Sequence, residues 1–415
     1  MVRFPGRKLN SPPFYVPSGI NSNYYPLFIM KQIIYFLPIL ALMVISCRTK
    51  TDKNTTSEEV KSGNDITGNF TLAPLAQPGQ GAYISGELIY PLVNKPTPEC
   101  HASTIVETPT GLVSAFFAGT YEKNPDVGIR VSRMVEGKWT WPEEVVNGVQ
   151  NDSLRYPLWN PVLFQPKEGP LLLFYKEGPD PITWWGMLMT SPDGGKTWSK
   201  PEKMGTDGKI GHLLGPVKNK PVQLEDGTII SPTSTEIKLE DGDVDWMVHF
   251  EISRDNGKTW EVVGPINDGK EFDAIQPSIL TYPNGKMQVL CRTRQDVISQ
   301  SWSEDQGKTW GKMTATELPN PNSGTDAVTL KDNRQLLIYN HTTKKGEEPK
   351  GRNMINLAIS DDGINWRPVM TLENVPAESG YSYPAMIQTS DGLVHITYTY
   401  LRQSVKHVVI DPKQL

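Results

Sequence analysis

The chain has 415 residues, enough for one large domain or two ordinary ones, and carries a formal net charge of −5. It has no block of basic residues, which argues against nucleic acid as a partner. Its 35 Gly, 35 Pro and 9% aromatic residues favour many short strands joined by turns over long helices.

The N-terminal region has the pattern of an export signal. From Met30 it reads MKQIIYFLPILALMVISC, with one Lys, an apolar run over Ile33–Ile45 and then Cys47. The apolar run is shorter than the roughly 20 residues that a membrane-spanning helix needs. We therefore expect translation to start at Met30, so that residues 1–29 are not translated and residues 30–46 form a signal peptide.

The end of this signal resembles the lipobox of bacterial lipoproteins, in which the cysteine receives the lipid. The sequence there is Val44-Ile45-Ser46-Cys47. The resemblance implies a lipid anchor on Cys47 and a periplasmic or cell-surface location on a bacterial membrane; an ordinary membrane anchor or uncleaved signal is the alternative. Residues 47–70 are polar and charged, which predicts a flexible tether. A folded domain is then expected over residues 71–415.

One short motif recurs through that domain. It reads SPDGGKTW at 191–198, SRDNGKTW at 253–260, SEDQGKTW at 303–310 and, in shortened form, SDDGINW at 360–366. A degenerate copy, SRMVEGKWTW, stands at 132–141. Repetition at intervals of about 50–60 residues indicates an array of similar structural units. Apolar runs between the copies, such as GPLLLFYKEG and GKMQVLCRTR, predict about four strands for each unit and no clear helix.

Closing such units into a ring removes exposed sheet edges, so we predict an all-β, six-bladed β-propeller of four-stranded antiparallel sheets. Five or seven blades remain alternatives. In each motif the Asp can accept backbone N–H bonds, Gly supplies a positive φ angle and Trp packs between sheets. The pattern resembles the Asp-box, or bacterial neuraminidase repeat. We expect its carboxylates to be structural: Asp193, Asp255, Asp305 and Asp362.

The segments between the repeats resemble the inner strands of the sialidase superfamily over nearly the whole domain. Sialidases carry an early Arg, an acidic Asp in the next loop, a Glu, two further Arg and a late nucleophilic Tyr. Here ESGYSYPAM resembles the segment with that Tyr, which assigns the role to Tyr381. Arg352 resembles the third Arg, and Asp126 in YEKNPDVGI resembles the acid. Arg292 in VLCRTR resembles the second Arg, with Arg294 as the alternative.

Two positions differ from the sialidase pattern. His101, in CHASTIVETPTG, stands in place of the early Arg, and a neutral imidazole cannot form the bidentate fork that Arg makes with a carboxylate. Gln276, in DAIQPSIL, stands in place of the Glu that activates the Tyr. A phenol with a pKa of about 10 needs a base to attack efficiently, and an amide is not a base. Glu236, in SPTSTE, is the candidate base from a neighbouring blade.

Four further polar residues lie in or beside predicted inner strands and are candidates for contact with an acidic sugar, although each could equally be structural. They are Lys176, Asn219, Asp326 and Asn340. Cys100 and Cys291 are far apart in the sequence, and we expect neither a disulfide nor a metal site from them. No metal, phosphate-loop or dinucleotide motif is present, so no cofactor is predicted.

The resemblance implies a sialidase-like exo-glycosidase that removes a terminal, anionic sugar from a glycan and works as a monomer. The His and Gln substitutions leave two alternatives open. One is a lyase that eliminates across a uronic acid, with Arg neutralising the carboxylate. The other is a propeller that binds glycans without catalysis.

Overall fold

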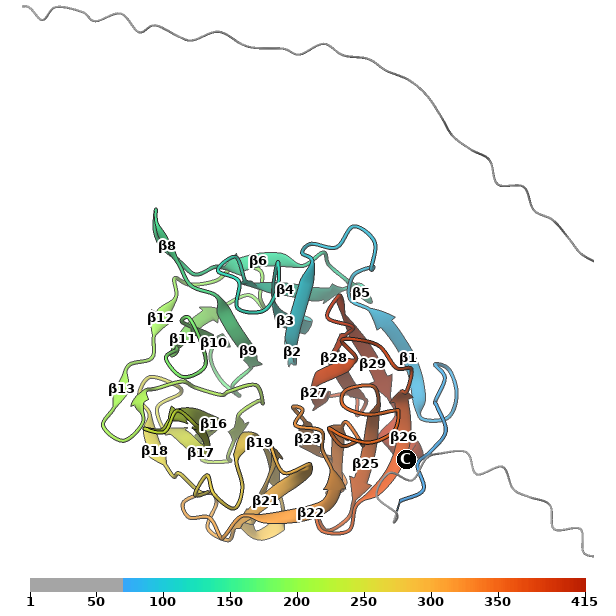
Figure 1. Ribbon diagram of the computed structural model, residues 1–415. Helices are drawn as coiled ribbons and strands as arrows, with labels where there is room; N and C mark the ends of the chain where they lie inside the picture. Colours follow the sequence, from blue (N-terminus) through green and yellow to red (C-terminus); the bar gives the residue numbers. More distant parts are fainter. Residues whose placement is uncertain (1–69) are drawn as a thin grey trace, which may run out of the picture. The chain divides into compact units, whose positions relative to one another are not determined.

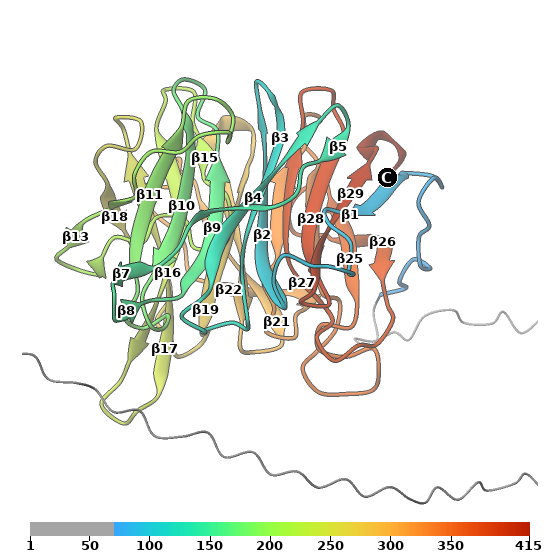
Figure 2. The same cartoon turned by 90° about the horizontal axis from the view of Figure 1, so that it is seen from above.

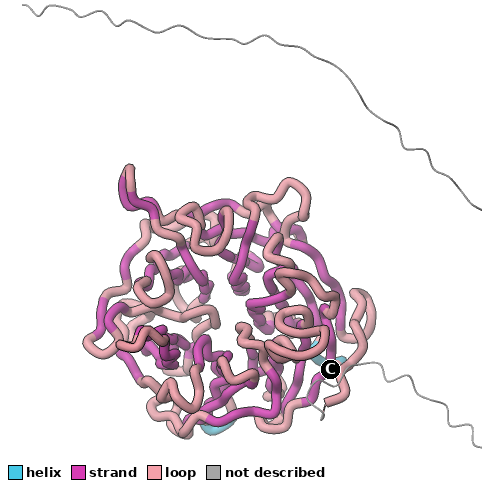
Figure 3. Tube along the Cα trace, viewed as in Figure 1, coloured by secondary structure: helices cyan, strands magenta, loops and turns pink. Residues whose placement is uncertain are grey.

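A computed structural model describes residues 70–415, and these form a ring of β-sheets (Figure 1). The predicted start at Met30, the signal peptide, Cys47 and all but the last residue of the tether lie outside the described residues. Almost all regular structure in the ring is strand (Figure 3). The helical segments among residues 70–415 are two three-residue 3-10 turns, η1 (Pro283–Gly285) and η2 (Pro412–Gln414). No helix in this range is long and apolar enough to cross a membrane.

Six antiparallel sheets stand as blades around the axis, which confirms the predicted six-bladed propeller. Each blade is given from its inner to its outer strand. The first has β2 (Glu99–Thr108), β3 (Gly111–Gly119), β4 (Gly128–Val135) and β5 (Lys138–Trp139), and β6 (Glu143–Val146) also pairs with β4. The second has β9 (Leu158–Phe164), β10 (Leu171–Glu177), β11 (Trp185–Ser191) and β12 (Glu202–Lys203), and the third has β15 (Val222–Gln223), β16 (Ile229–Lys238), β17 (Val244–Ser253) and β18 (Glu261–Val263).

The remaining blades are β19 (Ala274–Thr281), β20 (Met287–Thr293), β21 (Val297–Ser303) and β22 (Thr314–Pro319); β23 (Asp326–Thr329), β24 (Gln335–Tyr339), β25 (Ile355–Ser360) and β26 (Arg367–Glu373); and β27 (Tyr381–Gln388), β28 (Val394–Tyr400), β29 (Ser404–Ile410) and β1 (Tyr83–Leu88). Because β1 pairs with β29, the last blade joins both ends of the domain and closes the ring. Two small hairpins lie outside the blades: β7 (Val149–Asn151) with β8 (Leu154–Arg155), and β13 (Thr206–Asp207) with β14 (Gly211–His212).

The four Asp-box motifs form the turns between the third and fourth strands of their blades. In the copy after β21, Asp305 accepts hydrogen bonds from the backbone N–H of Thr309 (2.8 Å) and from its hydroxyl (2.6 Å), and Ser303 donates to the same carboxylate (2.8 Å). These bonds lower the pKa of Asp305 to about 2. Trp310 then stacks on Phe250 of the preceding blade, with ring centroids 4.5 Å apart. The motif is therefore structural, and its Trp joins neighbouring blades.

Four of the inner strands carry a β-bulge at an equivalent place near the axis. The register shifts in β2, β9, β19 and β27, and each bulge contains a residue with positive φ: Ala102 (55°), Asn160 (40°), Gln276 (58°) and Tyr383 (54°). The last three are followed by proline. Because a bulge changes the direction of the side chains that follow it, these positions decide which side chains meet at the centre of the ring.

In the third blade, the chain before the short strand β15 is irregular and is held by buried polar side chains. Glu251 accepts from the backbone N–H of Leu214 and of Gly215, both at 2.8 Å. Lys176 donates to the carbonyl of Pro216.

Cys100 and Cys291 are buried free thiols, as expected for unpaired cysteines.

Candidate functional site

Five side chains meet near the axis, and we call them the axial cluster: His101, Gln276, Arg292, Arg352 and Tyr383. The hydroxyl oxygen of Tyr383 accepts hydrogen bonds from Nη1 of Arg292 (2.8 Å) and from Nε2 of Gln276 (3.1 Å). The His101 ring lies against the Tyr383 ring, with centroids 4.1 Å apart. The Arg352 guanidinium lies 5.4 Å from the centroid of the same ring. Tyr383 is thus the residue that the other four surround.

Arg292 is fixed in this position by contacts on both sides of its guanidinium. Its Nε donates to Oδ1 of Asn322 at 2.6 Å, and its Nη1 also donates to Oε1 of Gln276 at 3.3 Å. The guanidinium lies 5.2 Å from the ring centroid of Trp246. No hydrogen bond among residues 70–415 involves Nη2 of Arg292, so this nitrogen is available to donate to a ligand.

The cluster is electropositive. Burial, and then the charge of Arg292, lower the pKa of Arg352 to about 10. Burial also lowers the pKa of His101 well below its ordinary value, and Arg402, Arg352 and Arg292 act in the same direction. His101 is therefore neutral at pH 7. Its Nδ1 lies 3.0 Å from the hydroxyl of Thr399.

Among the described residues, no carboxylate is in direct contact with the two central guanidiniums, although the charges of Glu122 and Glu236 act on them from further away. Within the described part of the chain, neither Arg292 nor Arg352 forms an ion pair or hydrogen bond with a carboxylate, whereas Arg402 at the edge of the cluster pairs with Glu122 at 2.7 Å. Two guanidinium groups of like charge, partly removed from water and without a carboxylate in contact, are suited to an anionic ligand.

The structure places Tyr381 outside the cluster. Its hydroxyl donates to the carbonyl of Val375 (3.1 Å), its ring contacts Tyr400, and it belongs to a hydrophobic core between two blades. Burial, and then the charge of Glu373, raise the pKa of Tyr381 to about 12. The tyrosine that faces Arg292 is Tyr383, which the sequence analysis did not select. The signal for it was the Tyr-Pro pair, which matches Asn-Pro in β9 and Gln-Pro in β19.

Asp126 makes its side-chain hydrogen bonds within its own loop and has none to the cluster among residues 70–415. Its carboxylate accepts from the backbone N–H (3.0 Å) and the hydroxyl (2.5 Å) of Thr120, so it closes its own loop. Arg155 donates to its backbone carbonyl at 2.9 Å. Glu122 of the same loop pairs with Arg402, which lies at the edge of the cluster.

Glu236 and Arg294 lie next to the cluster. Burial raises the pKa of Glu236, while the charges of Arg292 and Arg294 oppose that shift. Arg294 pairs with Asp273 at 3.2 Å and lies 4.2 Å from the ring centroid of Trp246. Arg294 therefore lies beside the cluster and is not one of the guanidinium groups that contact Tyr383.

The remaining candidates belong to buried networks that join the inner strands. Asn219 donates to the carbonyl of Gln276 and to Ser278, both at 2.8 Å. Asp326 accepts from Lys220 (2.9 Å) and from the backbone N–H of Met386 (2.7 Å).

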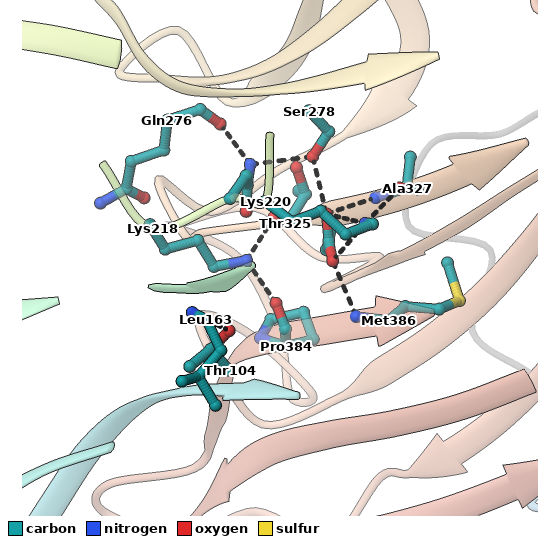
Figure 4. Close-up of polar contacts among 12 residues, drawn as sticks. Thr104, Leu163, Lys218, Lys220, Gln276, Ser278, Thr325, Ala327, Pro384 and Met386 are labelled. Carbon is teal, nitrogen blue, oxygen red and sulfur yellow. Dashed lines mark hydrogen bonds and ion pairs between the residues drawn. The ribbon is translucent and has the colours of Figure 1, made fainter. Parts of the chain in front are cut away.

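Two further side chains take part in these networks. Lys218 donates to the carbonyls of Thr325 (2.5 Å) and Pro384, as Figure 4 shows. Asn340 donates to the carbonyl of Tyr381 at 3.0 Å. Lys176, Asn219, Asp326 and Asn340 are each no more than 1% exposed, so the structure places them inside the protein and not against a ligand. Among residues 70–415 no group of three His, Cys, Asp or Glu side chains could hold a metal ion.

Comparisons with known proteins agree with this architecture. The family of BNR repeat-like domains matches residues 110–396. A protein of unknown function from Dyadobacter fermentans superposes with a TM-score of 0.65 at 19% identity, covering 79% of this chain and 98% of that one. The Hadza microbial sialidase Hz136 gives 0.66 at 17% identity, over 80% of this chain and 69% of that one.

The NanB sialidase of Streptococcus pneumoniae gives a TM-score of 0.61 at 13% identity, over 79% of this chain and 71% of that one. By sequence, no curated protein matches the chain. At these identities the likeness to solved structures concerns the fold.

Proposed function

The chain belongs to the family of BNR repeat-like domains and has the propeller fold of sialidases, and on this premise we propose that it is a sialidase-type exo-glycosidase acting on a terminal anionic sugar. The observation that carries the proposal is the pair of guanidiniums, Arg292 and Arg352, that face Tyr383 without a carboxylate partner. A sugar carboxylate would supply the missing negative charge and accept charge-assisted hydrogen bonds from both.

Tyr383 takes the role in this proposal that the sequence had assigned to Tyr381. Its hydroxyl lies within hydrogen-bond reach of Arg292, so a sugar held by the guanidiniums would be next to it. The N–H groups of Arg292 and Gln276 stabilise negative charge on the Tyr383 oxygen. His101 packs against Tyr383, and its neutral imidazole adds no further positive charge beside the phenol.

One observation favours a second candidate, elimination across a uronic acid. The side-chain hydrogen bonds to the Tyr383 oxygen come from an Arg and a Gln, and no described carboxylate takes the place of the Glu that activates the tyrosine of sialidases. In this reaction the Tyr383 phenolate would take the C5 proton of a uronate whose carboxylate is held by Arg, the C4–O bond would break as the C4=C5 double bond forms, and Tyr383 would return the proton to the departing oxygen, so that no water is consumed.

The experiment is a screen of the purified protein against sialosides and uronate-containing glycans. A hydrolase releases a saturated monosaccharide, whereas a lyase releases an unsaturated sugar that absorbs in the ultraviolet. Binding without any product would leave the non-catalytic propeller as the answer.

Two substitutions test the anion site. Arg352→Met should lower kcat/KM about 100-fold, because an ionic hydrogen-bonded contact contributes up to about 3 kcal/mol. Arg294→Met is the control, since Arg294 is already paired with Asp273, and it should change kcat/KM less than about threefold. Full activity in Arg352→Met would exclude the proposed carboxylate site.

A further inference from the structure

The segment of residues 215–220, which precedes β15, makes buried contacts with three blades other than its own. The strands of the blades run along the depth of the ring (Figure 2), and the inner strands β19, β23 and β27 of the last three blades are neighbours around the axis. Asn219 bonds to β19, Lys220 to β23 and Lys218 to β27. One short segment therefore joins the strands that carry Gln276 and Tyr383.

Lys218 occupies an unusual position for a lysine. Its side chain is buried, and its ammonium group donates to two backbone carbonyls, that of Thr325 at 2.5 Å and that of Pro384 (Figure 4). Its own φ angle is 82°, in the left-handed region that residues other than glycine rarely adopt. Within the described range Lys218 forms no ion pair, and the nearby Asp326 pairs with Lys220 instead.

The charge of this ammonium group does not explain why it is buried. Burial lowers the pKa of Lys218 to about 7, and the attraction of Asp326 opposes the shift without cancelling it. The charges of Lys220 and Arg292 act in the same direction as burial. A buried cation costs free energy that its contacts must offset. The contacts of this one hold two carbonyl groups of neighbouring blades in place.

The held carbonyls lie next to the axial cluster. Pro384 directly follows the bulge at Tyr383, where φ is 54°. Gly324 lies where three side chains meet, because a Cβ atom there would be 3.3 Å from Cε of Lys218, 3.1 Å from Oε1 of Gln276 and 3.5 Å from Cδ2 of Tyr383. The end of the Lys218 side chain thus lies close to the hydrogen-bonded pair of Gln276 and Tyr383.

From these contacts we propose that Lys218 is a positioning residue, whose ammonium group holds the bulge of β27 so that the Tyr383 hydroxyl faces Arg292 and the bound anionic sugar. The inference rests on the proposed function, because Lys218 acts through Tyr383 and not on the substrate. A tyrosine displaced by about 1 Å would lose its 2.8 Å hydrogen bond from Arg292 and about 100-fold in rate.

The first test is kinetic and uses Lys218→Met, which removes the ammonium group and keeps most of the apolar stem. On the glycan from the screen, kcat should fall about 100-fold, while KM should stay within about threefold because both guanidiniums of the anion site remain. Lys331→Met is the matched control. Lys331 also donates to two carbonyls of the last blade, those of Thr389 (2.8 Å) and Ser390 (2.9 Å), but beyond the opposite end of β27. It should leave kcat within about twofold.

Two further measurements separate positioning from general support of the fold. In a Tyr383→Phe background, Lys218→Met should lower kcat no further, because its effect passes through the missing hydroxyl. The crystal structure of Lys218→Met should show Tyr383 without its positive φ or without its contact to Arg292. If urea unfolding shows that Lys218→Met does not fold, Lys218→Gln replaces it in all three measurements, since its amide is uncharged and one bond shorter.

The inference is refuted if the folded Lys218 variant keeps kcat within about twofold, if its effect is equally large in the Tyr383→Phe background, or if its crystal structure leaves Tyr383 in place. A failure of the proposed function looks different: no glycan of the screen is turned over, or Tyr383→Phe is fully active. The crystal structure then still decides whether Lys218 sets the position of Tyr383.

Discussion

The two tyrosines at the start of β27 provide a direct test of which side chain acts on the substrate. Tyr383→Phe removes an oxygen that accepts hydrogen bonds from Arg292 at 2.8 Å and from Gln276 at 3.1 Å. Arg292 keeps a second acceptor in Gln276, but Nε2 of Gln276 loses its hydrogen-bond partner. One unsatisfied buried donor costs about 1–3 kcal/mol of stability.

Tyr381→Phe is the matched change two residues earlier. It removes one hydrogen bond, to the carbonyl of Val375 at 3.1 Å, and should cost about 0.5–1.5 kcal/mol. The two variants are thus expected to be folded and similar in stability. Their activities should differ widely, because loss of a group that takes part in proton transfer lowers kcat by about 100-fold to 10,000-fold.

The assay measures initial rates on the glycan identified by the screen, together with the free energy of unfolding in urea. We expect Tyr381→Phe to stay within about twofold of the unmodified protein and Tyr383→Phe to lose at least about 100-fold in kcat. A variant Tyr383→Phe that keeps its activity, or a Tyr381→Phe that loses it without unfolding, would refute the placement of the reaction at Tyr383.

Three other predictions concern stability. Asp326→Asn should destabilise the fold by about 3–5 kcal/mol, measured by unfolding in urea, because the buried Asp326 carboxylate pairs with Lys220. Asp332→Asn is the control, because it removes an exposed ion pair, and it should cost less than about 1 kcal/mol. Because the pKa of His101 is lowered in the folded state, the unfolded state takes up a proton first, and stability should fall below about pH 6.5. His101→Asn should reduce that loss by up to about 2 kcal/mol at pH 5. Asp305→Asn should lower Tm at pH 7, and the difference should vanish as the pH falls through about 2.

Each of these has a result that contradicts it. Equal costs for the Asp326 and Asp332 substitutions would mean that the Lys220 pair does not hold the inner strands together. An unchanged pH slope in His101→Asn would show that another group titrates there. If the Tm difference for Asp305→Asn persisted in strong acid, the loss of stability would not come from the charge of the carboxylate.

The sequence predicted the blades correctly because the Asp-box makes its contacts within a few residues. Ser303, Asp305 and Thr309 bond to one another inside a single turn, so the motif can be recognised without the rest of the fold. Among the site candidates, His101, Gln276, Arg292 and Arg352 are brought together in the structure. His101, Gln276 and Arg292 lie on β2, β19 and β20, and Arg352 lies in the loop before β25.

The choice between Tyr381 and Tyr383 could not be made from alternation alone. Two residues apart on an ideal strand, they would face the same side of the sheet. The bulge at Tyr383, where φ is 54°, breaks that relation, and one ring enters the cluster while the other enters the core. The position of Asp126 has a different cause, because its carboxylate bonds to Thr120 in its own loop.

The same bulges explain why polar residues near the axis are hard to interpret from sequence. A bulge interrupts the ladder between strands and leaves backbone carbonyls without strand partners. Asn219 satisfies the carbonyl of Gln276, and Lys218 satisfies the carbonyl of Pro384 beside Tyr383. These buried side chains hold the two bulges in the conformation that brings Gln276 and Tyr383 together. A polar residue near the axis can therefore serve the site by fixing its backbone, and only the hydrogen-bond partners distinguish that role from direct contact with a ligand.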